Sequence, residues 1–412
     1  MNDARAYLRV NKDTSIHMGK LKLVLLPSLK AKKLSDSQII ITKKLLEGIN
    51  EYQKYWVGEI EVILEEDRSV LDNLDNITIN VNQLSFSVRI LNYESAEFLR
   101  ALDQCNVVLA SVSHRQNEIS SYCQHMNIPC AYVSEYSLKT RFQIINSSFK
   151  NPFLRFRKYL WEIFQEKKQV KAIGIADGIQ CNGSPTFNAY RRINVNPLLY
   201  FDSRVTEDML ISNVELYKRT QVCLSKAKLR LVFSGRLLKM KGADHLIPTA
   251  MQLRKLGVNF VMYICGDGEL FNTMQEMIEK NGLNDYVIMK GVLKFREELL
   301  PFVKNQVDLF VCCHVQGDPS CTYLETMSCG VPIVGYANEA LTGVIEASGA
   351  GWVTKMNRPD MLAIKISELD SRRELLVEES EKSLAFASMH TFEKTFQNRI
   401  SHIRGIAEKA RL

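Results

Sequence analysis

Short β-rich runs alternate with helical segments along the first third of the chain, and this alternation restricts the fold more than any other feature. The first run, Lys20–Leu26, ends at Pro27, and a helix is expected to begin at Asp36 or Ser37. Further β-rich runs lie at 61–64, 77–80, 88–91, 107–109 and 129–133, with helical segments at 95–104 and 115–126. Strands that alternate with helices form βαβ units in a mostly parallel sheet. We therefore predict an α/β, doubly wound domain.

The alternation restarts after Asn196 and Pro197 and is more regular there. Strands are predicted at 229–233, 260–265, 287–289, 308–311 and 331–334, and helices at 242–256, 269–280, 296–304 and 322–329. The chain of 412 residues is also longer than one hydrophobic core usually supports. Two doubly wound domains are therefore predicted, over residues 1–215 and 216–385.

The composition is that of an ordinary soluble protein, with 46% hydrophobic and 24% charged residues and a formal net charge of +7. This mild positive excess suits an anionic small molecule or an anionic membrane surface, and no DNA- or RNA-binding motif accompanies it. Met1–Arg5 starts no apolar signal segment, and no run approaches the roughly 18 apolar residues of a spanning helix. We expect a cytoplasmic protein without a nucleic-acid partner, either free or at the inner face of a membrane.

The ten cysteines are irregularly spaced, and Cys312 and Cys313 lie inside a strand-like run. Such spacing in a long chain is typical of reduced, buried thiols rather than of a disulfide framework. The sequence contains neither a Cys-x-x-Cys pair nor two histidines at helical spacing. We therefore predict no metal site.

The segment NPFLRFRKYLWEIFQEKKQV, residues 151–170, predicts an amphipathic helix that opens on Asn151 and Pro152. Its apolar side chains are Phe153, Phe156, Leu160, Ile163 and Phe164, and the basic residues around them are Lys150, Arg155, Arg157, Lys158, Lys167, Lys168 and Lys171. One interpretation is that the apolar face packs on the sheet of its own domain. The other is that residues 150–171 rest on an anionic bilayer.

Candidate ligand-binding residues follow the strands of the second half, because open α/β sheets bind ligands beyond the carboxyl ends of their strands. After the strand that ends near Ser234 come Gly235, Arg236 and Lys241. Glycine lets a bulky anion approach the backbone, and the two cations can neutralise a diphosphate. A solvated basic turn is the alternative. Two other segments occupy corresponding places after later strands, but they are weaker signals of ligand binding: Gly266-Asp267-Gly268 and Lys290–Leu293.

The stretch HVQGDPSCTYLETMSCGVP, residues 314–332, places a turn ahead of a helix and a lone carboxylate within it. The amides of Ser320, Cys321 and Thr322 would open this helix and could hold a phosphate. Glu325 would then lie in the first turns, where it can accept hydrogen bonds from the hydroxyls of a ribose. Alternatively, Glu325 only stabilises the positive end of the helix dipole.

The succession GRLLKMKG, YICGDGEL, VIMKGVL and DLFVCCHVQGDPSCTYLETMSCGVPIVGY resembles the C-terminal domain of retaining glycosyltransferases of family 4 (glycosyl transferases group 1). The resemblance covers about residues 229–368, and over residues 1–228 it is only architectural, with a strand expected over 172–179. It implies the GT-B fold, in which two Rossmann-like domains face each other across a cleft. The N-terminal domain would bind the acceptor and the C-terminal domain the nucleotide-sugar donor. A final helix within 386–412 would cross back to the N-terminal domain.

The resemblance also implies roles for the residues that match the family motifs. Arg236 and Lys241 would grip the donor diphosphate, Glu325 would hold the ribose, and the amides of 320–322 would hold the phosphates. Val292 and Leu293 would flank the base, while Gly235 and Gly266 would let the donor approach the backbone. Such enzymes need no catalytic metal, and their donor is a substrate rather than a cofactor.

Two positions depart from the family pattern. A glutamate that holds the transferred sugar usually stands eight residues before Glu325, where this chain has Gly317; Asp318 is one residue later. The loop after the first strand is glycine-rich in many relatives, whereas here it is Pro27–Lys33, with lysines that could supply charge.

In the N-terminal half, His114 and Glu135 follow strands that would face the cleft, and either could act at the reacting centre or be purely structural. We predict transfer of a hexose-type sugar, with retention, to a hydroxyl of a saccharide or lipid-linked saccharide in cell-envelope polysaccharide or lipopolysaccharide synthesis. The alternatives are a nucleotide-sugar-binding protein without transferase activity, suggested by Gly317, and an epimerase of the same fold.

Overall fold

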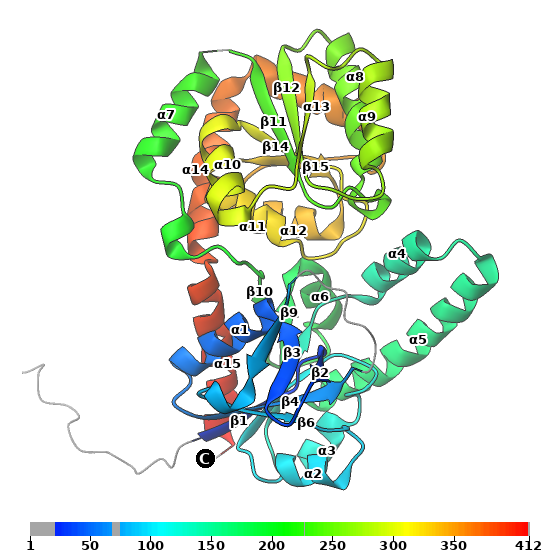
Figure 1. Ribbon diagram of the computed structural model, residues 1–412, viewed down its shortest axis with the longest axis vertical. Coiled ribbons are helices and arrows are strands. Elements are labelled where there is room, and N and C mark those ends of the chain that lie inside the picture. Colours follow the sequence, from blue (N-terminus) through cyan, green and yellow to red (C-terminus); the bar gives the residue numbers. More distant parts are fainter. Residues whose placement is uncertain (1–20, 68–74, 226, 411–412) are drawn as a thin grey trace, which may run out of the picture.

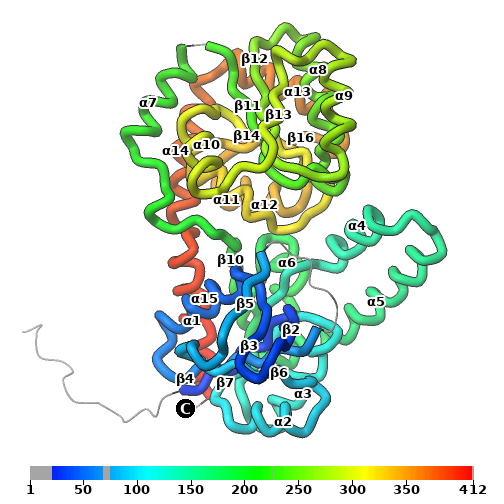
Figure 2. The backbone as a smooth tube through the Cα atoms, in the orientation of Figure 1, coloured from blue at the N-terminus to red at the C-terminus, as the bar shows by residue number. Residues whose placement is uncertain are grey.

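The computed structural model describes residues 21–67, 75–225 and 227–410 of the chain. Over these residues the protein forms two α/β domains that follow one another along the longest axis of the molecule (Figure 1). Each domain has its own sheet and its own core. The backbone trace in Figure 2 shows the chain running from α14 in the C-terminal domain into α15 beside the N-terminal sheet.

The C-terminal sheet has the strand order β13-β12-β11-β14-β15-β16, and every pair in it is parallel. Its strands are β11 (Leu229–Ser234), β12 (Phe260–Cys265), β13 (Val287–Gly291), β14 (Leu309–Cys312), β15 (Ile333–Tyr336) and β16 (Trp352–Thr354). Its helices are α7 (Asn213–Leu224), α8 (Leu246–Lys255), α9 (Phe271–Lys280), α10 (Leu300–Gln306), α11 (Cys321–Ser328), α12 (Glu339–Ser348), α13 (Pro359–Ser371) and α14 (Arg373–Met389). The predicted succession of strands and helices in this half is confirmed.

The N-terminal sheet is parallel from β10 through β9, β8, β7, β1 and β4 to β6, and β2 also pairs with β4. Its strands are β1 (Leu21–Leu25), β2 (Lys30–Lys33), β3 (Gln38–Thr42), β4 (Gly58–Glu66), β5 (Asn76–Asn80), β6 (Ser87–Ile90), β7 (Val107–Ser111), β8 (Cys130–Ser134), β9 (Gly178–Asn182) and β10 (Pro197–Tyr200). Its helices are α1 (Lys43–Tyr55), α2 (Ala96–Leu102), α3 (Ile119–His125), α4 (Leu138–Ser148), α5 (Pro152–Ile175) and α6 (Gly183–Tyr190). The prediction of a mostly parallel sheet is confirmed.

Two predicted elements of this half are wrong in detail. The helix expected from Asp36 or Ser37 is preceded by β3, whose Ile39 and Ile41 are buried and which pairs antiparallel with β2 and β5. The helix itself begins at Lys43, because the Thr42 side chain accepts a hydrogen bond from the Leu45 amide and caps it. A strand expected over 172–179 is shifted, since α5 continues to Ile175 and β9 begins at Gly178.

The helices near the C-terminus divide between the two domains. Phe386 and Ala387 of α14 pack in the C-terminal core, although the sequence had placed residues from 386 onward in the returning helix. The return is made by α15 (Phe392–Lys409), whose Phe396, Ile400 and Ile403 pack in the N-terminal core. Thr391 caps α15 and separates the two helices.

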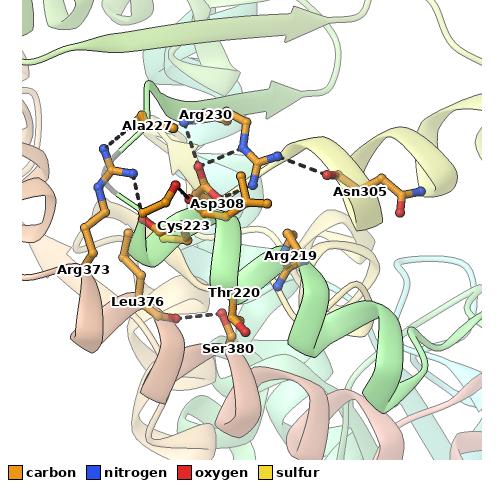
Figure 3. A network of polar contacts seen from close by, with 12 residues as sticks. Arg219, Thr220, Cys223, Ala227, Arg230, Asn305, Asp308, Arg373, Leu376 and Ser380 are labelled. Atoms are coloured by element: carbon orange, nitrogen blue, oxygen red, sulfur yellow. Dashed lines mark hydrogen bonds and ion pairs between the residues drawn. The ribbon is translucent and has the colours of Figure 1, made fainter.

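A buried polar network joins α7, β11 and α14 at the amino end of the C-terminal sheet (Figure 3). Asp308 accepts hydrogen bonds from the Arg230 guanidinium at 2.6 and 3.0 Å. Arg373 of α14 donates to the carbonyl oxygens of Cys223 and Ala227. Because ligands bind at the opposite, carboxyl end of such a sheet, this network has a structural role.

The helix α5 projects with α4 from the side of the N-terminal domain (Figure 1). Asn151 caps it and Pro152 stands in its first turn, as predicted. The interpretation that its apolar face packs on its own domain is wrong for the first three turns, since large apolar side chains there are exposed: Phe153, Leu154, Phe156, Leu160, Trp161, Ile163 and Phe164. Among the described residues, no helix is long and apolar enough to cross a bilayer.

All ten cysteines are free thiols, and nine of them are buried. The exception is the half-buried Cys321 at the start of α11. Burial raises the pKa of the Cys312 thiol to about 11, which keeps it protonated at neutral pH. The prediction of reduced, buried thiols is confirmed.

Candidate active site

The strand order of the C-terminal sheet reverses between β11 and β14, and the loops after these two strands meet there. Gly242 follows β11 with φ +63°, and a Cβ at this position would lie 1.9 Å from the Cys313 carbonyl oxygen after β14. Only glycine fits this approach. It brings Lys241, the residue before Gly242, next to the turn that carries Asp318.

Lys241 and Asp318 form a largely buried ion pair, with Nζ 2.7 Å from Oδ2. Although burial opposes ionisation, the Lys241 ammonium holds the pKa of Asp318 below its usual range. The second carboxylate oxygen of Asp318, Oδ1, is buried and has no hydrogen-bond partner among the described residues. It can therefore accept a hydrogen bond from a ligand.

Two further buried polar groups precede Asp318. His314 accepts or donates a hydrogen bond at Nδ1 with the Tyr323 hydroxyl, 3.2 Å away, while its Nε2 is unpartnered. Burial, reinforced by the charge of Lys241, lowers the pKa of His314 to about 3, so the ring is neutral at physiological pH. The Oε1 atom of Gln316 is also buried and unpartnered within the described chain. Unsatisfied buried atoms of this kind cluster where a polar ligand is expected.

Arg236 is exposed on the loop after β11, and no ion pair links it to a described residue. The loop is held close to its neighbour, because a Cβ on Gly266 would lie 2.0 Å from the Gly235 carbonyl oxygen. Burial raises the pKa of Tyr136, Asp318 raises it further, and Arg236 opposes the shift. Since Tyr136 belongs to the N-terminal domain, the charges of Arg236 and Asp318 both face that domain.

The first turn of α11 is open at its amino end. Ser320 occupies the N-cap position but makes no side-chain capping bond, so the first amides of α11 are not satisfied by a side-chain cap. The Sγ atom of Cys321 lies 3.9 Å from Nζ of Lys44 and 3.6 Å from the Asp202 carboxylate. Lys44 also pairs with Asp202. A cation of the N-terminal domain therefore stands at this helix terminus.

Glu325 is buried in α11 and accepts a hydrogen bond from Arg204 Nε at 2.6 Å. Burial raises the pKa of Glu325, and the Arg204 guanidinium only partly offsets that shift. Arg204 stacks on the ring of Phe295, 3.8 Å from its centroid. It thereby connects Glu325 with the segment after β13, where Val292 is 74% exposed and Leu293 packs against the core.

The turn at Gly317 joins the two domains. The Gly317 amide donates to Gln143 Oε1 at 2.9 Å, and its carbonyl accepts from Thr140 Oγ1. A Cβ at this position would lie 3.3 Å from Cβ of Glu339, so a side chain here would be tightly confined. Glu339 also pairs with Lys139 of α4, which strengthens the same contact.

On the N-terminal side, Glu135 follows β8 and accepts hydrogen bonds from Asn182 at 2.7 Å and Tyr200 at 3.3 Å. Water still reaches the Glu135 side chain, but desolvation by the surrounding protein and the Asp202 carboxylate raise its pKa. Glu135 lines a pocket beyond β1, β7 and β8. His114 does not line this pocket, and its ring packs on Trp161 of α5.

The loop after β1 does not bring its lysines to the site, although the sequence interpretation assigned them that role. Pro27, Ser28 and Leu29 line the same pocket. Lys30 and Lys33 bound β2, and Lys33 pairs with Asp36, so these lysines do not supply charge to the pocket. Among the described residues there is also no group of three or more His, Cys, Asp or Glu placed to hold a metal ion.

The sequence interpretation missed five residues of the candidate site: Lys44, Asp202, Arg204, His314 and Gln316. Lys44 and Cys321 are 277 positions apart, and Arg204 and Glu325 are 121 apart. No local spacing reveals such pairs.

A comparison with protein families shows that residues 218–383 match the family model "Glycosyl transferases group 1". The match covers about two fifths of the chain and lies in its C-terminal half. Curated relatives include WcaL from Salmonella typhimurium, named for colanic acid biosynthesis, which is 25% identical over 146 residues. The matched region is 34% of this chain and 36% of WcaL. A mannosyltransferase from Mycolicibacterium smegmatis, GDP-mannose-dependent and specific for phosphatidylinositol monomannoside, is 26% identical over 152 residues, or 35% of this chain and 39% of its own.

Solved structures extend the likeness over both domains. HepE from Anabaena, determined in complex with UDP, superposes with a TM-score of 0.65 at 15% identity, over 93% of this chain and 99% of HepE. WaaB, named as a lipopolysaccharide outer core galactosyltransferase, has a TM-score of 0.63 at 12% identity, over 95% of this chain and all of WaaB. The fold of this chain is therefore GT-B, as the sequence predicted.

Proposed function

We propose that the protein is a retaining glycosyltransferase that moves a hexose-type sugar from a nucleoside diphosphate sugar to a hydroxyl. One observation carries the proposal. At the point where the strand order of the C-terminal sheet reverses, Lys241, paired with Asp318, and Lys44 of the N-terminal domain, paired with Asp202, lie near the uncapped start of α11. Cations and helix-terminal amides at one place match a diphosphate leaving group.

In the proposed complex, Arg236, Lys241 and the amides of 320–322 bind the diphosphate. Gly235 and Gly266 allow the donor to approach the backbone because they carry no side chain, and at Gly266 a Cβ would lie 2.0 Å from the Gly235 carbonyl oxygen. The buried carboxylate of Glu325 accepts hydrogen bonds from the ribose, in exchange for its contact with Arg204.

The exposed Val292 and the partly buried Leu293 flank the base. Their neighbour Phe295 is linked to Glu325 through Arg204, which supports one continuous nucleotide site.

In the proposed reaction, the bond between the anomeric carbon and the diphosphate oxygen breaks, the acceptor oxygen bonds to that carbon on the same face, and the proton of the acceptor hydroxyl passes to the departing diphosphate. Preorganised positive groups around the developing charge are typically worth several kcal/mol. Glu135 orients the acceptor hydroxyl, and no protein nucleophile is needed. Asp318 and Gln316 hold the donor sugar in place of the family glutamate, since each has a buried acceptor without a partner. We assign no role to His114.

Binding of nucleoside diphosphates tests the donor site. UDP, GDP and ADP would be titrated calorimetrically, and we expect Arg236→Ala and Lys241→Ala to weaken the preferred nucleotide at least tenfold, about 1.4 kcal/mol. Lys239→Ala is the matched control, because Lys239 is exposed in the same short turn as Lys241. Unchanged affinity in both site variants would refute the proposed donor site.

A nucleotide-sugar-binding protein without transferase activity is the second candidate, because Gly317 replaces the family glutamate and is engaged in the contact between the domains. Both candidates bind nucleotide. They differ in whether nucleoside diphosphate is released when nucleotide sugar and an acceptor are mixed with the protein. Release that depends on the acceptor supports the transferase.

The proposed acceptor is a saccharide or lipid-linked saccharide of the cell envelope, presented at the inner face of a membrane. The names of WcaL and WaaB support the first part. The exposed apolar side chains of α5, among basic residues, support contact with an anionic bilayer. Replacing Phe156 and Phe164 by serine should reduce binding to phosphatidylglycerol vesicles at least fivefold. Val195→Ser, at a 95% exposed position outside α5, should not.

A further inference from the structure

A cavity of about 290 Å³ opens beyond the carboxyl ends of β1, β7 and β8 in the N-terminal domain. The strand order of this sheet reverses between β1 and β7, so the cavity occupies the position at which doubly wound domains bind their ligands. Its volume is near the lower end of the range for small-molecule sites. None of the roles proposed above uses the interior of this cavity.

Most of the cavity wall is apolar. Leu25 of β1, Leu45 and Ile49 of α1, and Val133 of β8 contribute aliphatic surface. Phe392 and Phe396 of α15 contribute aromatic surface, with ring centroids 4.8 Å apart. Tyr52 completes this aromatic side, at 5.5 Å from Phe396.

Gly48 keeps part of the cavity open, because α1 has no side chain at this point. A Cβ there would lie 3.2 Å from Cζ of Phe396. A glycine inside a helix destabilises that helix by about 1 kcal/mol relative to alanine.

Charged groups line the cavity in two places: Arg399 of α15 lies beside the rings of Phe396 and Tyr52, 5.2 and 5.8 Å from their centroids, and the others lie at the end that faces the donor site. Lys44, Glu135 and Asp202 line it there. Lys44 is paired with Asp202 and lies 3.9 Å from Cys321, the first residue of α11. Glu135 is fixed by two hydrogen bonds and can still accept another from a hydroxyl.

A ligand that spans the cavity would therefore need a polar part at one end and an apolar part at the other. A hydroxyl fits the end next to Glu135 and α11, where the sugar would be transferred. A sugar ring does not suit the opposite part, because its hydroxyl groups would lose their hydrogen bonds to water against leucine, isoleucine and phenylalanine, and the unpartnered Tyr52 hydroxyl there could replace only one of them. An apolar group fits there.

We infer that the acceptor carries an apolar group, either an aromatic ring or a short hydrocarbon chain, close to its reacting hydroxyl, and that this group fills the cavity. The inference rests on the proposed function, since it concerns the acceptor of that reaction. It names a substrate class rather than a compound. The recognising chemistry is apolar contact with α1 and α15 together with a hydrogen bond to Glu135.

Binding of three glucosides that differ only in the group on the anomeric oxygen tests the inference. Methyl, hexyl and phenyl β-D-glucoside would be titrated against the full-length protein without nucleotide, below the concentration at which hexyl glucoside forms micelles. We expect hexyl or phenyl glucoside to bind at least tenfold more tightly than methyl glucoside. If hexyl glucoside binds more tightly than phenyl glucoside, the apolar group is a hydrocarbon chain. If phenyl glucoside binds more tightly, the apolar group is an aromatic ring.

Leu45→Phe fills the cavity from α1 and should reduce the preference to less than threefold. Leu46→Phe is the matched control, because Leu46 is also half-buried on α1 but does not line the cavity. Nucleotide affinity should be unchanged in both variants, which shows that they are folded. Equal affinity for the three glucosides, no binding of the apolar ones, or a preference that persists in Leu45→Phe would overturn the inference. Since no nucleotide is present, this outcome is distinct from failure of the donor site.

Discussion

Replacing Lys241 by methionine (K241M) tests the electrostatics of the donor site, because the change keeps the length of the side chain and removes its charge. In the structure the ammonium is 2.7 Å from the Asp318 carboxylate, and the Asp318 side chain is only 15% exposed. The variant leaves this carboxylate buried without its cation. Burial, which opposes ionisation of Asp318, then acts without the compensating charge.

The size of the effect follows from what the carboxylate can do instead. Breaking a buried ion pair by removing one partner typically costs about 3–5 kcal/mol. Asp318 can avoid part of this cost by taking up a proton. For an aspartate whose pKa in the unfolded chain is about 3.9, protonation costs about 4 kcal/mol at pH 7 and about 1.5 kcal/mol at pH 5. The loss of stability is therefore bounded by about 4 kcal/mol at pH 7 and becomes smaller as the pH falls.

Urea unfolding of wild type, K241M and the control Lys239→Met at pH 7 and pH 5 measures this difference. We expect the midpoint of K241M to be lowered clearly at pH 7 and much less at pH 5, with the control unchanged at both. Adding Asp318→Asn to K241M should restore most of the stability, because no charge remains buried, while nucleotide affinity stays at least tenfold below wild type. An equal loss at both pH values, or a larger loss at pH 5, would refute the reasoning.

Three further predictions concern individual residues. Glu325→Gln should weaken nucleoside diphosphate binding about tenfold by calorimetry; equal affinity of wild type for the nucleotide and its deoxyribose analogue would argue against a ribose contact. Burial lowers the pKa of Arg219 to about 10, and its guanidinium donates hydrogen bonds to the carbonyl oxygens at the end of α11, including that of Cys329 at 2.5 Å. Arg219→Met leaves these oxygens without a donor and should lower the free energy of unfolding by about 1–3 kcal/mol, measured by thermal unfolding. Desolvation and the Asp202 carboxylate raise the pKa of Glu135, whereas the charge of Lys44 lowers it. Lys44→Met should therefore move the acidic limb of the pH profile of the transfer rate to higher pH. A limb that stays in place or moves to lower pH would contradict the role assigned to Glu135.

The C-terminal half could be predicted closely because its determinants are local. The central strands β11, β12, β14 and β15 of its parallel sheet are buried on both faces and appear as short apolar runs, and glycine marks the loops that approach one another. The positions of Lys241 and Glu325 relative to strands and helices follow from these runs. The ion pair of Lys241 with Asp318 does not, since the two residues are 77 positions apart.

The N-terminal half was predicted less well. The run QIIIT was interpreted as part of a helix, because its pairing with β2 and β5 is a tertiary contact that the sequence does not display. Of the two interpretations of the apolar face of α5, packing on its own domain is wrong for the first part of the helix, where this face is exposed. An amphipathic pattern establishes that a helix has an apolar face, but not what covers that face.

By itself, the sequence determined that the chain has two doubly wound domains, that the second resembles the donor domain of family 4 glycosyltransferases, and that Gly317 departs from the pattern of that family. These are properties of short segments, fixed by hydrophobic period, turn residues and spacing. Only the tertiary structure decided which charges meet across the domains, such as Lys44 with the start of α11 and Arg204 with Glu325. Side chains separated by more than a hundred residues come together through the packing of whole domains, and no local pattern encodes that arrangement.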